Sequence, residues 1–309
     1  MSTFPGQDQV QEQALVAMRA LDVEGALALV RRARRIDPRL VDLDGLEEAL
    51  VWLLPRLAGG AADLALADAL QAVVAEGLAG RLGSVAAMFV DSAIARHLCQ
   101  RQRPSGSFID DACRVPAALV DLILGSAAVA RMSLADAIRD GRGNRADLWG
   151  YLGDACHIEQ RHVEAEGCYA RALLLDPDAV DAWRLRDRRL GACLGDLEGR
   201  HGADARGLWF AAAWIDGILD IPVGNNWLTP NQIAIRQDGT GSTTAAACRR
   251  FSLLLYFDRS ARPGTTDMSR REEMAELLPE WFARFMAACR GRERGTDKGR
   301  PRLGSAWSH

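Results

Sequence analysis

One stretch of the chain, LWGYLGDACHIEQRHVEAEGCYARALLLDP at 148–177, constrains the fold more than any other. Its apolar and small residues recur at the three- and four-residue spacing of an α-helix. The pattern stops at Asp176-Pro177, because a proline pushes the residue before it out of the α region. The stretch therefore predicts two helices, at about 146–159 and 162–175, joined by a short turn.

Two sets of residues would face each other between these helices: Trp149, Leu152 and Cys156 from the first, and Ala165, Tyr169 and Ala172 from the second. Gly153 and Ala165 are small where the helices would cross, so the two axes can come close. Tyr169 supplies the large side chain at this crossing. We therefore interpret the conspicuous residues of the stretch as packing residues, none of which needs to be a reagent.

These residues, at these spacings, resemble the tetratricopeptide repeat, a helix–turn–helix unit of 34 residues. The resemblance covers 146–179, with Cys156 where the repeat pattern has a tyrosine. Degenerate copies are predicted at about 8–40 and 180–220, the latter with helices at 178–194 and 203–220. The resemblance implies a mainly α protein, a TPR-like α-solenoid of antiparallel helix pairs, because one repeat cannot bury its own faces.

The rest of the chain is divided by changes in pattern. We expect 1–221 to be one TPR-like helical array, and 222–260 to be an irregular loop or a β-hairpin with strands at 232–236 and 250–257. Residues 251–257 also fit a buried turn of helix. Residues 261–290 would carry a C-terminal capping helix at about 269–289, and 291–309 a disordered basic tail. Its end, SAWSH, is similar to the start of an affinity tag. Further helices are expected at about 43–56, 61–80, 83–101, 115–125 and 133–140.

The charge and the cysteines restrict the class of protein. A net charge of −3 provides no bulk attraction for nucleic acid, and no run approaches the length of a membrane helix. The N-terminus lacks the features of a secretory signal. The seven cysteines are odd in number and include no CxxC pair, which favours reduced thiols and a cytoplasmic location.

A partner-binding face is predicted on the first helix of the stretch at 146–179 that resembles a tetratricopeptide repeat. In tetratricopeptide arrays these helices line a concave groove, and the resemblance places Asp147, Asp154, His157 and Arg161 there. A solvated helix face would carry the same charges, so both interpretations stay open. Asn225, Asn226 and Trp227 are predicted to form a second contact segment, in the loop at 222–260.

Patterns for metal or catalytic chemistry are incomplete. Cys156 and His157 point about 100° apart on one helix, so Cys156, His157, His162 and Cys168 are not expected to bind a metal ion. The turn DGTGSTT at 238–244 lacks the lysine of a phosphate-binding loop. RRFSLLLYFD at 249–258 resembles a strand of 2-oxoglutarate-dependent hydroxylases, but no histidine lies between 201 and 309 to bind iron. No cofactor is predicted.

The sequence thus favours a scaffold or adaptor that binds a protein or peptide partner in a concave helical groove. A narrower form is an assembly or maturation chaperone of a bacterial enzyme or secretion system. The alternative is an enzyme whose array carries a small catalytic region at 222–260, such as a degenerate oxygenase or transferase. Asn225, Asn226, Arg236 and Asp238 would then matter for activity. The apolar final helix leaves a homo-oligomer open.

Overall fold

The computed structural model describes residues 13–14, 16–17, 20, 22–36, 44–57, 69–70, 72–73, 80, 84–101, 117–221, 243–261 and 267–295. Within these ranges every regular element is a helix and no strand occurs. The mainly α fold class is therefore confirmed for the described part of the chain. None of its helices combines the length and the hydropathy that crossing a membrane requires.

The chain divides into two compact units, Met1–Ala130 and Arg131–His309. The boundary falls inside residues 1–221, where the sequence predicts one continuous array. It lies within helix α8 (Ala127–Ala137), which therefore contributes residues to both units.

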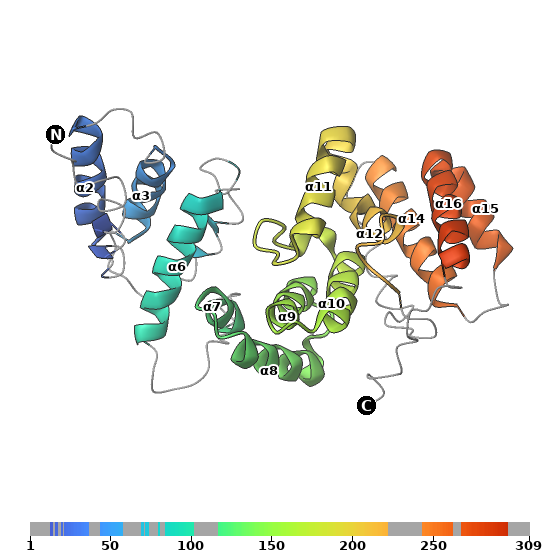
Figure 1. Cartoon of the computed structure of the whole chain (residues 1–309), viewed down its shortest axis with the longest axis horizontal. Helices are drawn as coiled ribbons and strands as arrows, with labels where there is room; N and C mark the ends of the chain where they lie inside the picture. Colours follow the sequence, from blue (N-terminus) through green and yellow to red (C-terminus); the bar gives the residue numbers. More distant parts are fainter. Residues whose placement is uncertain are drawn as a thin grey trace. The chain divides into compact units, whose positions relative to one another are not determined.

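The described part of the first unit contains α2 (Val23–Ile36), α3 (Asp44–Leu57), α6 (Ser84–Arg101) and α7 (Ala117–Ile123). Each packs on the next in chain order, α2 on α3, α3 on α6 and α6 on α7 (Figure 1). Glu47 of α3 accepts hydrogen bonds from Arg31 and Arg34 of α2, which lowers the pKa of its carboxyl group. Apolar side chains fill the core between these helices, among them Ala26, Val30, Leu50, Leu53, Ile94 and Leu98.

A π-helical turn, Ile138–Arg142, ends α8 and lets the chain reverse into the next helix. Gly141 has a φ of 99° there, a conformation that glycine adopts without steric cost. An ion pair of 2.5 Å between Arg131 and Glu159 joins α8 to the far end of α9. The two helices therefore run in opposite directions.

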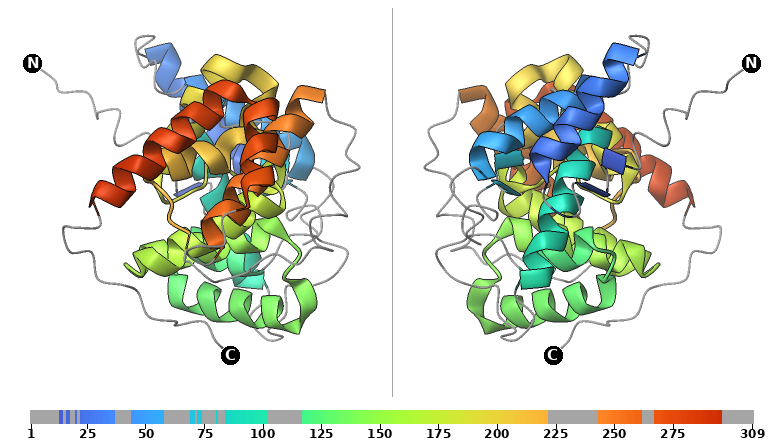
Figure 2. Two further views of the ribbon diagram at one scale, coloured as in Figure 1. Left: turned by 90° about the vertical axis from the view of Figure 1, so that its right-hand side faces the viewer. Right: turned by 90° about the vertical axis from the view of Figure 1, so that its left-hand side faces the viewer.

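The second unit continues with α9 and α10, a 3-10 turn at Pro177–Ala179, then α11, α12, α14, α15 and α16. Their bounds are Ala146–Ile158, His162–Leu175, Arg188–His201, Ala205–Ile215, Thr243–Ser260, Met268–Leu277 and Pro279–Gly295. α9 packs on α10 and α11 on α12, while α14 lies between α12 and α15. Figures 1 and 2 show α14, α15 and α16, coloured orange to red, side by side.

The two helices predicted at 146–159 and 162–175 are confirmed as α9 and α10, with α9 one residue shorter. The helix predicted at 178–194 is wrong in its first half, because α11 begins only at Arg188. The side chain of Asp187 accepts a hydrogen bond of 3.0 Å from the Arg189 N–H and caps that helix. Residues 180–187 therefore form a connecting segment.

The strand predicted at 250–257 is also wrong, because these residues belong to α14. Cys248, Phe251 and Leu255 recur at helical spacing and are buried, so this face of α14 packs into the unit. The other predicted strand, 232–236, lies outside the described residues. The apolar run RFSLLLYF has the composition of a strand, and burial on several sides allows it to be a helix instead.

The predicted final helix at 269–289 consists of two helices. Leu278 leaves the helical conformation, with φ −145° and ψ 78°, directly before Pro279. This break follows from the restriction that proline places on the preceding residue. It allows α15 to pack on α14 while α16 turns back onto α15 and α12.

Candidate functional site

The crossing of α9 and α10 is built around Gly153. A side chain at this position would place its Cβ 2.5 Å from the ring carbons Cδ1 and Cε1 of Tyr169. The close approach of the two helices at this point therefore depends on the absence of a side chain at residue 153. The predicted facing residues are all buried: Trp149, Leu152, Cys156, Ala165, Tyr169 and Ala172.

Asp154, predicted on the exposed binding face, is buried instead. Its Oδ1 accepts a hydrogen bond of 2.7 Å from the Tyr169 hydroxyl and one of 2.8 Å from the Arg186 N–H. Burial raises the pKa of its carboxyl group to about 7, although both hydrogen bonds favour the ionised form. The placement of Asp154 on an exposed face is therefore wrong, because the following segment folds over it.

A second carboxylate, that of half-buried Asp181, holds the same connecting segment to α9. Asp181 Oδ2 accepts a hydrogen bond of 2.6 Å from the Tyr151 hydroxyl and one of 2.9 Å from Arg184. Arg206 of α12 donates to the carbonyl oxygens of Pro177 and Val180. Residues 177–187 are thus attached to α9 and α12 through polar contacts at both ends.

His157 is half-buried near the end of α9, where three elements meet. Its ring centroid lies 5.3 Å from that of His162, at the start of α10, in an edge-on arrangement. Burial lowers its pKa, and the charges of Asp187 and Arg189 also act on it. The imidazole is therefore mostly neutral near neutral pH.

Two exposed arginines are added to this region, Arg186 just before α11 and Arg189 in the first turn of α11. Arg186 is exposed, and within the described part of the chain its guanidinium has no ion pair. Arg189 forms an ion pair with Asp187 at 2.6 Å. Burial acts to raise the pKa of Asp187, but the hydrogen bonds from the Arg189 side chain and backbone N–H lower it below its usual value. We call the side chains of His157, His162, Arg186 and Arg189 the His157 surface.

The other predicted residues take separate positions. Asp147 is paired with Arg145 through two hydrogen bonds at the start of α9. Arg161 precedes α10 and pairs with Glu164, three residues further on. Asn225, Asn226 and Trp227 lie outside the described residues, as do Arg236 and Asp238 of the enzyme alternative, so those calls stay predictions.

The four residues considered for a metal site separate into two pairs. Cys156 and Cys168 are buried inside the helix pair, while the ring of His157 lies against that of His162 near the surface. Among the described residues, no group of three or more potential ligands is arranged to hold a metal ion.

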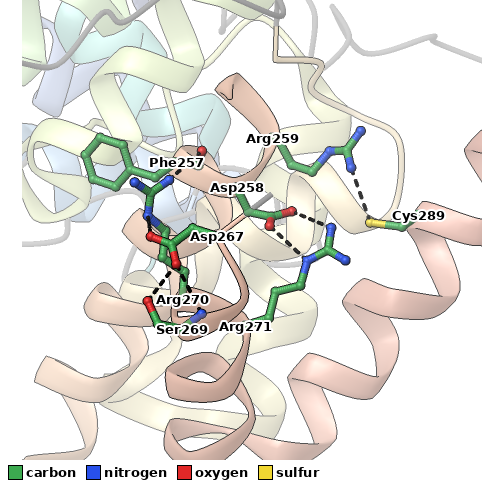
Figure 3. Close-up of polar contacts among 8 residues, drawn as sticks. All are labelled: Phe257, Asp258, Arg259, Asp267, Ser269, Arg270, Arg271 and Cys289. Atoms are coloured by element: carbon green, nitrogen blue, oxygen red, sulfur yellow. Dashed lines mark hydrogen bonds and ion pairs between the residues drawn. The ribbon is translucent and has the colours of Figure 1, made fainter. Parts of the chain in front are cut away.

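The polar side chains clustered in the C-terminal helices α14, α15 and α16 are paired with one another. Figure 3 shows both carboxylate oxygens of Asp258 facing the Arg271 guanidinium, at 2.9 and 3.1 Å. Asp267 caps α15 and pairs with Arg270, and Arg259 donates to the sulfur of Cys289. The contacts of Asp258 and Arg259 join α14 to α15 and α16, so we assign this cluster a structural role.

Sequence reasoning missed Arg186, Asp187 and Arg189, because the region was interpreted as the interior of a helix. The run RLRDRR at 184–189 is the signal that marks them.

In comparisons with known proteins, the chain matches no family model, no curated protein and no solved structure.

Proposed function

We propose that this chain is a helical scaffold that binds a protein or peptide partner, and that the His157 surface is part of its binding site. The proposal is supported by the antiparallel pair of α9 and α10 and by the resemblance of 146–179 to a tetratricopeptide repeat. Arrays of helix pairs act by displaying side chains on a surface.

The observation that carries the proposal is the way this surface is held. Buried Asp154 accepts a hydrogen bond from the Arg186 backbone N–H, and buried Asp187 holds the Arg189 side chain, while both arginines are exposed residues. A surface that is ordered before binding loses less conformational entropy when a partner arrives. Exposed arginines beside a neutral imidazole suit carboxylate and carbonyl groups on that partner.

Affinity purification from the native host, followed by binding measurements with the purified partner, tests the proposal. The site variant combines Arg186→Glu with Arg189→Gln, which keeps side-chain hydrogen-bond donors at position 189. Its matched control combines Arg200→Glu on α11 with Arg290→Gln on α16, two exposed arginines, and changes the net charge equally.

We expect a partner that co-purifies with the wild type and with the control, and that binds the site variant at least about tenfold more weakly, equivalent to about 1.4 kcal/mol. Circular dichroism of each variant checks that its helices are intact. Equal binding by the site variant and the control would remove the His157 surface from the proposal. A wild-type chain that purifies alone would contradict the scaffold function itself.

A further inference from the structure

The carboxyl group of Asp154 joins two segments that are far apart along the chain. It lies on α9 and is 4% exposed. Its Oδ1 accepts one hydrogen bond from the Tyr169 hydroxyl of α10 and one from the backbone N–H of Arg186. An asparagine side chain could accept the same two hydrogen bonds without a charge. The carboxyl group therefore has a property, ionisation, that the contacts themselves do not require.

The connecting segment at 177–187 is held at three places, and Asp154 provides the one nearest to α11. The start of the segment is attached to α12 through Arg206, and its middle is attached to α9 through Asp181. Near its end, Arg186 is attached to α9 through Asp154. If that last bond opens, the end that carries Arg186 can move while the rest of the segment stays attached.

The closed arrangement suits the protonated form of Asp154. Because Oδ1 receives both donors, a proton can sit on Oδ2 without breaking either hydrogen bond. The ionised form instead places a negative charge in the interior, and within the described part of the chain no basic side chain forms an ion pair with it. Burial of a carboxylate that has no ion-pair partner is costly, so ionisation favours a state in which Asp154 reaches water.

The ionisable groups that act on Asp154 are Tyr169 from α10 and, from the connecting segment, Arg186 and Asp181. Burial raises the pKa of Asp154 to about 7. Both hydrogen bonds and the charge of Arg186 act against this rise, and the charge of Asp181 adds to it. Burial also raises the pKa of Tyr169 well above its usual value, so its hydroxyl keeps its proton while Asp154 titrates. In this cluster, Asp154 is therefore the group that changes charge near neutral pH.

We propose that Asp154 is a pH-sensitive positioning residue for the His157 surface. In its protonated form it holds the Arg186 end of the connecting segment against α9 and α10, and on ionisation it releases that end. Asp154 does not touch the partner, but acts through the position of Arg186. Its role in binding rests on the proposed scaffold function, whereas its hold on the segment belongs to the chain alone.

Hydrogen exchange of single backbone amides in the folded, full-length chain tests this hold without a partner. The Arg186 amide should exchange when the connecting segment opens, whereas the amide of Leu255, buried in α14, should exchange only when the whole unit unfolds. We therefore expect a lower protection factor at Arg186 than at Leu255. Between pH 5 and pH 8, the protection factor of Arg186 in the wild type should fall at least about tenfold, because the closed form keeps a proton that the open form loses.

Asp154→Asn is the matched variant, because its amide oxygen accepts both hydrogen bonds and does not ionise. Protection of its Arg186 amide should change little between pH 5 and pH 8. Other ionisable groups, among them His157, are present in both proteins, so the comparison cancels their titration. The proposal is overturned if the wild type protects Arg186 as strongly as Leu255, or if protection of Arg186 falls by the same factor in both proteins. If the variant does not fold, a wild-type protection factor that is equal at the two pH values overturns it.

The same measurement with the co-purified partner separates this inference from the scaffold function. A partner that binds only the closed surface should raise the protection of the Arg186 amide. Protection that rises with the partner but does not depend on pH would support the scaffold function and overturn the role of Asp154. Protection that depends on pH but is unchanged by the partner would support the hold of Asp154 on the segment and remove the His157 surface from the binding site.

Discussion

The Tyr169 hydroxyl donates a hydrogen bond of 2.7 Å to the Asp154 carboxylate, while the ring of the same tyrosine lies against Gly153. The Tyr169 side chain of α10 therefore contacts two neighbouring residues of α9, Gly153 and Asp154. Asp154 also accepts the Arg186 N–H at 2.8 Å. The contact that joins the helix pair is thus connected to the segment that displays the exposed arginines.

Gly153→Ala should destabilise the second unit. The added Cβ would lie 2.5 Å from two ring carbons of Tyr169, and the hydroxyl bond to Asp154 resists displacement of that ring. Overpacking of this kind costs about 1–3 kcal/mol. The free energy of unfolding, measured by urea denaturation, should fall by about that amount.

Gly195→Ala is the control for that substitution, because it lies in α11 with no atom within 4 Å of an added Cβ. We expect it to stabilise the chain by up to about 1 kcal/mol, since alanine has the higher helix propensity. If both variants destabilise the chain equally, the Gly153–Tyr169 contact is not the cause.

Asp154→Asn should change how stability depends on pH. Burial raises the pKa of Asp154 to about 7, against a reference value of 3.8. Between these values the folded chain holds the proton and the unfolded chain does not, so the contribution of Asp154 to the unfolding free energy falls as pH rises from about 4 through 7. The asparagine variant has no such contribution.

The measurement is urea denaturation of the wild type and Asp154→Asn at pH 5 and pH 8. The wild type should lose on the order of 2 kcal/mol relative to the variant between these conditions. His157 has a lowered pKa, so its contribution rises with pH, and comparing the two proteins at each pH cancels it. A constant difference between the two proteins would mean that Asp154 does not titrate in this range.

Asp258→Ala should lower the free energy of unfolding much more than Glu273→Ala. Each substitution removes a carboxylate that pairs an α14 residue with an α15 residue. The Asp258 side chain is 1% exposed and its partner Arg271 21%, whereas Glu273 and Arg250 are 39% and 40% exposed. Breaking a buried pair costs about 3–5 kcal/mol. Breaking an exposed pair costs at most about 1 kcal/mol.

Chemical denaturation of both variants, at low and at high salt, checks this difference. The Glu273→Ala effect should shrink further in high salt, because exposed charges are screened. Equal losses from the two variants would show that burial does not set the strength of these pairs.

Gly207→Ala should weaken the packing of α12 on α14. An added Cβ would lie 2.8 Å from the Cys248 Cβ and 3.2 Å from the backbone oxygen of Ala245 and the backbone nitrogen of Arg249. Backbone atoms cannot rotate away, so we expect a loss of about 1–3 kcal/mol, towards the upper end. Thermal denaturation measures it, with Gly199→Ala, where an added Cβ meets no atom within 4 Å, as the control.

Local patterns predicted helices well where spacing and end signals agreed. In α9 and α10, an apolar face repeats over several turns and Asp176-Pro177 marks the end, so the two helices lie within one residue of the predicted bounds. In α14 the pattern was ambiguous. The run RFSLLLYF is apolar in nearly every position, and such a run does not distinguish a strand from a helix buried on several faces.

The candidate site was less predictable than the helices. His157 lies at the surface, but the neighbouring prediction, Asp154, is buried under residues more than thirty positions further along the chain. Arg189 acts on His157 from the first turn of α11, which begins late, at Arg188. Helical periodicity describes one element at a time, so it cannot show which segment covers a given face.

The sequence by itself determined the helical class, the bounds of α9 and α10, and the use of Gly153 and Tyr169 as packing residues, because each depends on neighbours within a few turns. Only the tertiary structure decided that Asp154 is buried and that 250–257 is helical. These outcomes depend on which distant segment removes a side chain from water. The free energy of that burial exceeds the local conformational propensity of the residues.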